Sequence, residues 1–432
     1  MAPVTYVQSF GRSKSLKHEA VLDLHDRYAP LPAGPRPFLP FGLGRSYGDV
    51  CLNEGGTLLC TRGLKRFIAF DRASGRLTCE SGVLLQEILA LAVPQGFFLP
   101  VTPGTRLVTL GGAIANDVHG KNHHVAGSFG RHVVRFELLR STGERLVCSQ
   151  TENRELFRAT IGGLGLTGLI TWAEIQLIEV ANPFMIVEQT RFHSLDEYFS
   201  LNEEKAANWP YTVAWFDCGA KVGRGIYMAG RHAPVQESLP PWRERTIHFP
   251  FDPPFSMVRR STVRLFNLAY YHRPLGRGPR LVHHVPFFYP LDGVLDWNRA
   301  YGRRGLMQYQ CVLPPGCARD ALLELLTIIA RHREGSFLAV LKTFGNQEPP
   351  GMLSFSRPGT TLALDFAYRG QKTERLFQEL DAVVAFAGGA LNPSKDACMS
   401  GEMFRRAYPA FEEFSRFIDP AFSSSFWRRV TR

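Results

Sequence analysis

Short apolar runs separated by glycine and polar residues occupy the first part of the chain, from Pro37 to Ile178. Several runs are rich in β-branched and aromatic residues and are bounded by turn residues, which is typical of strands. The predicted strands are Thr57–Cys60, Phe67–Asp71, Arg76–Ser81, Arg135–Arg140 and the long alternating segment Leu169–Val180. Apolar residues at helical spacing predict one helix, Leu84–Pro94. The Asn182–Pro183 pair then interrupts the pattern and predicts a domain boundary.

The middle of the chain has longer elements. An alternating strand from Phe184 and a helix around Leu195–Glu204 come first, and the stretch Pro240–Pro290 has no regular pattern. Further predicted strands are Tyr211–Asp217, Met307–Leu313, Phe337–Lys342 and Thr361–Phe366, and a further helix is Cys317–Arg331. Strands and helices in this order predict an antiparallel sheet covered by helices on one face. The fold class is therefore expected to be α+β.

The length of the chain predicts two domains that share a cleft, because 432 residues exceed the usual size of one hydrophobic core. We predict a first domain over residues 1–182 and a second over 183–370. The remaining segment, 371–432, has a mostly helical pattern, and we expect it to return to the first domain.

The net charge indicates the class of partner, and the cysteine content indicates the cellular compartment. The formal net charge of +11 favours an anionic partner, although a merely basic surface is the alternative. The sequence has no helix-turn-helix, zinc-finger or RNA-binding signature, so we expect no nucleic acid. The eight cysteines are scattered without a CxxC pair, which favours reduced thiols. With no apolar leader or long apolar run, we expect a cytoplasmic protein, with peripheral contact to the inner face of the membrane left open.

Two glycine-rich segments carry the first candidate chemistry. In PFGLGRSYGD, Pro40–Asp49, the glycines let backbone amides converge on phosphate oxygens, and Arg45 adds charge; an ordinary tight turn is the alternative. Residues 101–133 are so dense in glycine and polar groups that they make a poor core, which indicates a bound ligand. A metal site at His119, His123 and His124 is the alternative there, but neither a carboxylate nor a cysteine completes it.

Two further segments are less specific. Ile161–Ile170 contains GxGxxG at Gly163, Gly165 and Gly168, but the next segment alternates as a strand, whereas a Rossmann fingerprint opens a helix. We therefore reject the Rossmann fold and expect a turn that closes over a planar ligand. The segment LNPSKDACMS, Leu391–Ser400, places a lysine among Asn, Ser and Asp, which is usually a solvated loop.

In this order, GLGRSYGD, then TPGT, GGAIANDVHGKNHH and GSFG, then GGLGLTG resemble the PCMH-type FAD-binding domain of the vanillyl-alcohol-oxidase flavoproteins. More narrowly, His119–His124 and FFYPLDGVLDWNRAYGRRGLMQYQ at Phe287–Gln310 resemble the FAD-dependent decaprenylphosphoryl-β-D-ribose 2-oxidases. The resemblance extends from about Phe38 to the C-terminus and is weakest in Ala181–Pro286. It implies a two-domain fold, with an antiparallel-sheet substrate domain after the FAD-binding domain.

The resemblance also implies site residues. Those expected to hold FAD are Pro40, Phe41, Gly42, Leu43, Gly44, Arg45, Ser46, Tyr47, Gly48, Asp49, Val50, Gly104, Thr109, Leu110, Gly111, Gly112, Asn116, Asp117, Val118, His119, Ile170 and Asn392. Those expected to contact the substrate are Tyr47, Gln308, Gln310, Lys342 and Lys395. Relatives with covalent flavin often have His at the place of Arg45, so non-covalent FAD is implied. Ala363 and Ala367 replace the Cys and Pro of mycobacterial members, which alters the pocket wall.

The implied reaction moves a hydride from a sugar carbon to the flavin while a base takes the hydroxyl proton. We favour His119 or water as that base, because an unperturbed imidazole has a pKa of about 6.5. Lys395 would position the sugar and stabilise negative charge. The substrate would be a polyprenyl-phosphate-linked ribose, oxidised at its 2-hydroxyl as the first half of an epimerisation towards an arabinose donor, completed by a partner keto-reductase.

A basic segment bears on the same substrate. Between Arg243 and Arg280 there are eight Arg, no Lys and two acidic residues, interleaved with aromatic and aliphatic residues. Guanidinium groups suit phosphates, and the apolar residues suit a membrane or an isoprenoid chain; a solvated loop is the alternative. Two other functions stay open: an alditol or sugar-lactone oxidase of the same fold that uses oxygen, and a non-catalytic binding protein with a vestigial flavin site.

Overall fold

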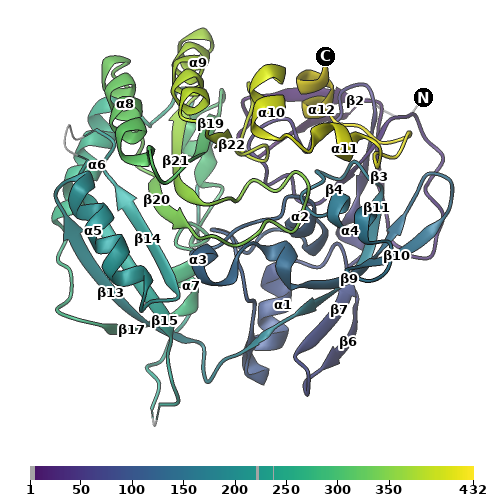
Figure 1. Cartoon of the computed structure of the whole chain (residues 1–432), viewed down its shortest axis with the longest axis horizontal. Coiled ribbons are helices and arrows are strands. Elements are labelled where there is room, and N and C mark those ends of the chain that lie inside the picture. Colours follow the sequence, from purple (N-terminus) through teal and green to yellow (C-terminus); the bar gives the residue numbers. More distant parts are fainter. Residues whose placement is uncertain (1–4, 220–222, 237) are drawn as a thin grey trace.

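The computed structural model of the chain describes residues 5–219, 223–236 and 238–432. Two groups of sheets divide it, with the purple-to-blue part of the chain on one side of Figure 1 and the teal-to-green part on the other. Helices and antiparallel sheets occur in both parts, as expected for an α+β protein. No helix in the described ranges is long and apolar enough to cross a membrane.

The first part is built on a five-stranded antiparallel sheet and a three-stranded parallel one. The five-stranded sheet runs in the order β10 (Arg145–Ser149), β9 (Val133–Leu139), β11 (Leu169–Gln176), β7 (Arg76–Glu80) and β6 (Phe67–Asp71). The parallel sheet comprises β3 (Ala20–Asp23), β5 (Thr57–Cys60) and β4 (Phe38–Phe41). Two small pairs are β1 (Thr5–Gln8) with β2 (Ser15–His18), and β8 (Phe97–Phe98) with β12 (Ile178–Glu179).

Short helices connect these strands. They are α1 (Leu85–Ala92), α2 (Leu110–Ala115), α3 (His123–Ala126) and α4 (Arg154–Thr160), with 3₁₀ turns η1 (Thr61–Gly63), η2 (Val93–Gln95) and η3 (Phe129–His132). The predicted strands and the helix are present within a few residues of their expected bounds. The expected single strand over residues 169–180 is wrong, because the chain leaves the large sheet after Gln176, and β12 pairs with β8 instead.

The second part is an eight-stranded antiparallel sheet. Its order is β17 (Arg280–His283), β13 (Phe184–Phe192), β15 (Gly225–His232), β14 (Tyr211–Phe216), β20 (Ala339–Phe344), β21 (Gly359–Ala367), β19 (Leu306–Leu313) and β22 (Ala390–Leu391). A two-stranded pair, β16 (Ile247–His248) with β18 (Val294–Leu295), and the turn η4 (Trp297–Tyr301) lie outside this sheet. The predicted antiparallel sheet is therefore present.

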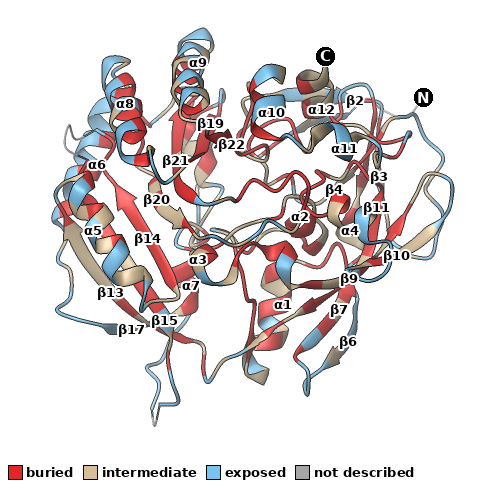
Figure 2. Ribbon diagram, in the orientation of Figure 1, coloured by how far each residue is buried: buried red, intermediate tan, exposed pale blue. Residues whose placement is uncertain are grey.

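Helices cover both faces of this sheet, so the expectation of helices on one face is wrong. One face packs in a single core with α5 (Leu195–Ala206), α8 (Ala318–Arg331) and α9 (Gln371–Phe386). Helix α6 (Arg260–His272) packs on the opposite face, where Tyr271 joins a cluster with Trp215 and Ile226. Strands β14 and β19 are buried along their whole length, and Figure 2 shows them red, because the two faces are covered by different layers.

The expectation of an irregular stretch over residues 240–290 is wrong, since it contains α6, β17 and α7 (His284–Phe288). Helix α6 buries Val263, Asn267 and Tyr271 and leaves Leu265, Phe266 and Leu268 exposed.

The C-terminal tail reaches both parts. Helix α9 belongs to the second sheet, whereas α10 (Gly401–Ala407), α11 (Phe411–Ser415) and α12 (Ser425–Thr431) follow β22 and lie beside the first part in Figure 1. The backbone N–H of Phe38 donates to Ala421, and that of Ser423 donates back to Phe38. The sheets change between β12 and β13, near the predicted boundary; the division into domains at 182 and 370 stays a prediction.

Candidate active site

One cleft brings the predicted site residues together from distant parts of the chain. It is lined by the loop after β4, the segment around α2, the end of the loop before β11, the loop after β22 and one face of β19, β20 and β21. All predicted cofactor and substrate residues line this cleft except Gly48, Asp49 and Leu110. The alternation along the strands places Gln308, Gln310 and Lys342 on the cleft face and their neighbours in the core.

The first two glycine-rich segments touch each other at the cleft wall. Thr109 caps α2, because its hydroxyl accepts from the Gly112 N–H at 3.1 Å. A Cβ atom at Gly42 would lie 2.5 Å from that hydroxyl oxygen, so no side chain fits there. Gly44 has φ +59°, which favours glycine at the bend of the first segment. The close contact explains why the first segment needs glycine at position 42.

Unpaired polar groups in this cleft fit an anionic, polar ligand. Gly104 has open space where its Cβ would stand. Arg45 forms no ion pair in the described residues, and its buried Nε lacks a hydrogen-bond partner. Ser81 Oγ and Asn116 Oδ1 are also buried without partners. Buried polar atoms are normally satisfied, so this set fits the phosphates and hydroxyls of a dinucleotide such as FAD.

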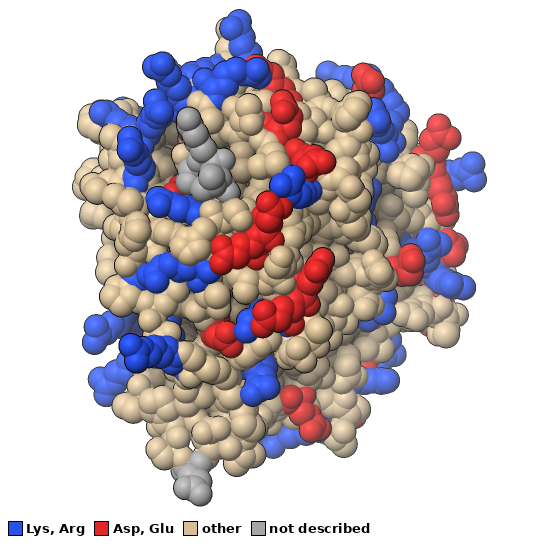
Figure 3. Space-filling view, turned by 60° about the vertical axis from the view of Figure 1, so that its left-hand side comes forward, with Lys and Arg blue, Asp and Glu red and all other residues tan. Residues whose placement is uncertain are grey.

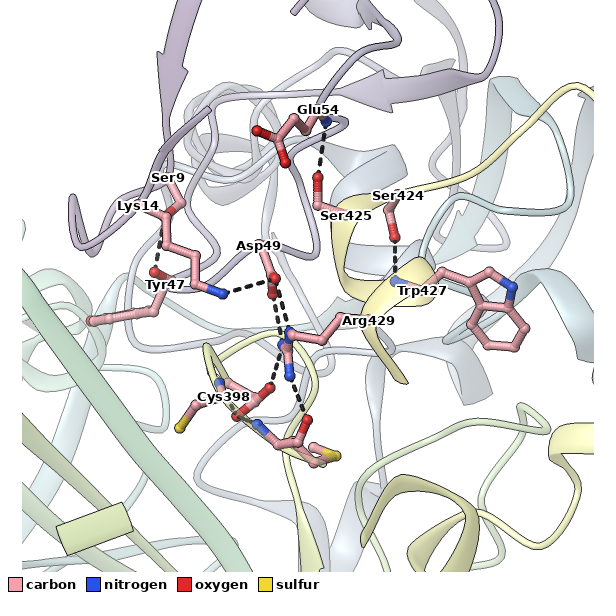
Figure 4. Close-up of polar contacts among 12 residues, drawn as sticks. Ser9, Lys14, Tyr47, Asp49, Glu54, Cys398, Ser424, Ser425, Trp427 and Arg429 are labelled. Atoms are coloured by element: carbon pink, nitrogen blue, oxygen red, sulfur yellow. Dashed lines mark hydrogen bonds and ion pairs between the residues drawn. The ribbon is translucent and has the colours of Figure 1, made fainter. Parts of the chain in front are cut away.

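Two of the predicted cofactor residues brace the loops. The Asp117 carboxylate accepts from Ser128 Oγ (2.8 Å), the Gly130 N–H (2.8 Å) and Ser354 Oγ (2.6 Å), and so fastens the second segment. Asp49 binds Lys14 and Arg429, as Figure 4 shows, at 3.1 and 2.8 Å. Asp49 therefore links the first segment to α12 and lies outside the cleft.

The third segment also reaches the cleft, through Gly165, Gly168 and Ile170. Gly165 has φ +77° and Gly168 φ +136°, and strand β11 begins directly after them. The expected turn before a strand is confirmed, so this GxGxxG is not a Rossmann fingerprint.

A network of hydrogen bonds surrounds His119. Its Nδ1 lies 2.7 Å from Lys342 Nζ, and its Nε2 lies 3.0 Å from Gln310 Nε2. Lys342 Nζ also donates to the Gly120 carbonyl at 3.0 Å, and Asn392 Nδ2 donates to Gln310 Oε1 at 3.0 Å. A neutral Lys342 that accepts from Nδ1–H satisfies every one of these contacts.

Burial and cationic neighbours fix the charge states of this network. Burial lowers the pKa of His119 well below 6.5, and Lys342 lowers it further. Burial likewise lowers the pKa of Lys342 well below its usual range, helped by Lys121 and Lys395. The expected advantage of an unperturbed imidazole pKa at His119 is therefore wrong, because both nitrogens are engaged and the imidazole is a weak base here.

Lys395 also lines the cleft. It follows Asn392 in the loop after β22, and its Nζ lies 4.3 Å from the centre of the Tyr47 ring. Burial lowers the pKa of Lys395 to about 8, so a substantial neutral fraction exists near neutral pH. Tyr47 is held by its own backbone N–H, which donates to the Ser394 carbonyl at 3.0 Å.

Two site residues were missed in the sequence. Gln308 Nε2 donates to the fully buried Asp365 at 2.5 Å, and burial raises the pKa of Asp365 to about 7. Asp365 lies two residues after Ala363 on β21, so strand alternation was the available signal. Lys121 lines the cleft, donates to the Phe288 carbonyl at 3.1 Å, and has its pKa lowered to about 8 by burial.

The three histidines of the metal alternative point to different partners. The His123 ring packs 4.5 Å from that of Phe344, and His124 Nε2 lies 3.1 Å from the Trp209 carbonyl. Among the described residues, no three His, Cys, Asp or Glu side chains converge as metal ligands.

Comparison with known proteins agrees with this site. Residues 27–149 match the family described as FAD binding domain. A decaprenylphosphoryl-beta-D-ribose oxidase of Mycolicibacterium smegmatis is 35% identical over 92% of this chain and 90% of its own length. An uncharacterized protein of Streptomyces coelicolor is 33% identical over 81% of this chain and all of its own length. An L-gulonolactone oxidase of Scyliorhinus torazame is 30% identical over 32% of this chain and 31% of its own length.

The fold, the cleft and the FAD-binding match define a FAD-dependent oxidoreductase. The match with the mycobacterial oxidase covers nearly all of both chains. The chain therefore belongs to the decaprenylphosphoryl-beta-D-ribose oxidase family. The α+β fold, the FAD cofactor and the family predicted from the sequence are confirmed.

Proposed function

We propose that this enzyme oxidises the 2-hydroxyl of a polyprenyl-phosphate-linked ribose to a ketone. The reaction would be the first half of an epimerisation towards an arabinose donor, and a separate keto-reductase would complete it. The observation that carries the proposal is the polar cluster of Tyr47, Gln308, Gln310, Lys342 and Lys395, which lines the same cleft as the glycine-rich segments. Such a cluster suits a hydroxylated ring held beside a redox cofactor.

The chain's own residues would hold FAD without a covalent bond. Gly104 leaves room for a ligand, Arg45 offers an unpaired charge to the pyrophosphate, and Ser81 and Asn116 offer unpaired polar atoms. Arg45 stands where covalent relatives often have histidine and cannot form that bond. These residues would hold FAD so that its flavin could supply the hydride acceptor for the sugar carbon.

Lys395 would take the proton of the sugar hydroxyl. The C2–H bond breaks with its electron pair leaving as hydride, the O–H proton passes to the neutral amine of Lys395, and the carbon–oxygen bond becomes a carbonyl. A pKa of about 8 suits an amine that must be unprotonated to act near neutral pH. His119, fixed between Lys342 and Gln310, would orient the pocket and would not accept the proton of the sugar hydroxyl.

Product analysis tests the proposal. The enzyme would be incubated with polyprenyl-phosphoryl ribose, and the product would be reduced with borodeuteride. We expect deuterium at sugar carbon 2, in a mixture of ribose and arabinose epimers. Deuterium at another carbon, or none, would refute the assigned position.

The alternative is an alditol or sugar-lactone oxidase that passes electrons to oxygen. The gulonolactone oxidase match favours it only for about a third of the chain. Turnover of free alditols or lactones, with oxygen consumed and the lipid-linked sugar ignored, would favour this alternative.

A further inference from the structure

Exposed apolar side chains concentrate in one segment of the second part. Among the described residues, seventeen large apolar side chains are exposed, and ten of them lie between residues 235 and 268. They are Val235, Leu239, Trp242, Ile247, Phe251, Phe255, Met257, Leu265, Phe266 and Leu268. Exposed apolar residues are normally scattered singly, whereas a group of them marks an interaction surface.

Helix α6 presents its apolar side outwards. It is fixed to the protein by Val263, Asn267 and Tyr271, and Asn267 Nδ2 donates to Asp217 Oδ1 at 2.8 Å. Leu265 is 70% exposed and Leu268 46% exposed. A helix stabilised only by packing would place these leucines inside. The outward apolar side therefore points to an external apolar phase.

The same segment carries positive charge that nothing in it neutralises. Eight arginines lie between residues 243 and 280, and none forms an ion pair with a described residue. The two acidic residues of this segment pair outside it: Glu244 with Arg106, and Asp252 with Arg12 and Arg299. In Figure 3, basic side chains gather along the left edge of the face, while acidic ones form a band across its middle.

This surface lies one layer of side chains from the cleft. Val258 and Val263 pack in one cluster with Tyr47 and Tyr301. Tyr47 lines the cleft, as does Trp297, which packs against the same cluster. A chain that entered from this surface would have a short path to the substrate residues.

We propose that an anionic bilayer binds this α6 surface, made up of Phe251, Phe255, Met257, Arg259, Arg260, Arg264, Leu265, Phe266 and Leu268. The apolar side chains enter the acyl boundary while the guanidinium groups bind lipid phosphates. In a symmetric dimer the same patch would face itself, which would oppose Arg259, Arg260 and Arg264 to their own copies. Docking rests on the proposed function for its purpose, since it would present a membrane-held prenyl chain to the cleft.

Vesicle flotation of the FAD-loaded protein tests the docking without any sugar lipid. Vesicles of equal parts phosphatidylglycerol and phosphatidylcholine should bind the protein, and phosphatidylcholine alone should bind it less. We expect Leu265→Glu with Leu268→Glu to weaken binding about tenfold or more, through lost apolar insertion. Arg260→Glu with Arg264→Glu should weaken it similarly and reduce its salt dependence.

Matched substitutions on α9 serve as controls. Phe386→Glu removes a side chain that is 92% exposed, and Arg375→Glu reverses an exposed charge, so both should bind vesicles like the wild type. Wild-type protein that stays in the aqueous fraction, or controls that lose as much binding as the α6 variants, would overturn the proposal. A wild-type dimer that Leu265→Glu makes monomeric would assign the surface to a second copy instead.

Turnover separates this proposal from the proposed function. With a short-chain, water-soluble phosphoryl ribose, the α6 variants should match the wild type, whereas with vesicle-embedded substrate they should be about tenfold slower. Wild-type protein that binds vesicles but oxidises neither substrate would leave the docking intact and refute the proposed substrate. Wild-type protein that oxidises the soluble analogue but binds no vesicles would support the proposed substrate and refute the docking.

Discussion

Arg429 holds the first glycine-rich segment to the C-terminal tail. We predict that Arg429→Met lowers the stability of the protein and weakens FAD binding. Its guanidinium bridges Asp49 and Asp396 at 2.8 Å each, and the two carboxylate side chains are 4% and 6% exposed. A Cβ atom at Gly48 would lie 1.4 Å from the Asp396 carbonyl oxygen, so the two backbones touch at this point. A shift of Asp396 must therefore move the loop that lines the cleft.

The expected magnitude follows from the two buried carboxylates. Removing one partner of a buried ion pair costs about 3–5 kcal/mol, because a charge is left uncompensated. Lys14 still binds Asp49 at 3.1 Å in the variant, so we expect about 3 kcal/mol, at the low end of that range. The displaced loop should also weaken FAD binding by about 1.4 kcal/mol, which is a tenfold higher Kd.

Urea unfolding of the FAD-free protein and fluorescence titration with FAD measure the two effects. Arg429 and Lys14 lower the pKa of Asp49, so the stabilisation is present above the unfolded pKa of about 3.9 and is lost as pH falls through the folded value. The difference in the free energy of unfolding between wild type and variant should therefore decrease at low pH. Arg375→Met on α9 is the control. A variant whose free energy of unfolding at pH 7 lies within about 0.5 kcal/mol of the wild type would show that Arg429 does not hold this loop.

Three further predictions concern the cleft. Gly104→Leu should fill open space and raise the Kd for FAD at least about tenfold without lowering the stability of the apoprotein. Gly316→Ala, also in open space but outside the cleft, should change neither the Kd nor the stability. An unaltered Kd in Gly104→Leu would contradict the placing of FAD beside Gly104. Lys395→Met should slow FAD reduction about 10²–10⁴-fold. In the wild type the rate of FAD reduction should rise with pH up to about 8 and then level. The same rise of the rate with pH in the variant would exclude Lys395 as the base. Asp365→Ala should free Gln308 and raise KM for the sugar about tenfold, with FAD binding unchanged. Asp365→Asn keeps a hydrogen-bond acceptor and should therefore keep KM close to the wild-type value. Equal KM values in the two variants would point to packing alone.

The sequence predicted which segments meet but not how each side chain is used. Glycine density identified the cleft walls because the contact of Gly42 with the Thr109 side chain and the bend at Gly44 both favour glycine. Alternation along the strands identified the sheet that carries Gln308 and Gln310. Asp49 and Asp117 could not be distinguished from ligand contacts, because their partners lie far away in sequence or in other loops.

Two features could not be predicted from the sequence: the charge state of His119 and the presence of helix α6. The pKa of His119 depends on burial and on Lys342, which is more than two hundred residues away, so a free-imidazole value misled. Helix α6 was missed because it lies in a stretch rich in proline and arginine that was predicted as irregular, although its apolar residues recur at helical spacing.

Anaerobic mixing of the purified protein with polyprenyl-phosphoryl ribose, followed through the visible flavin absorption, shows whether the enzyme oxidises this substrate. We expect a yellow protein whose flavin band bleaches with the lipid-linked sugar and stays unchanged with free ribose or xylitol. A band that bleaches only with free polyols, or a colourless protein that takes up no added FAD, would contradict it.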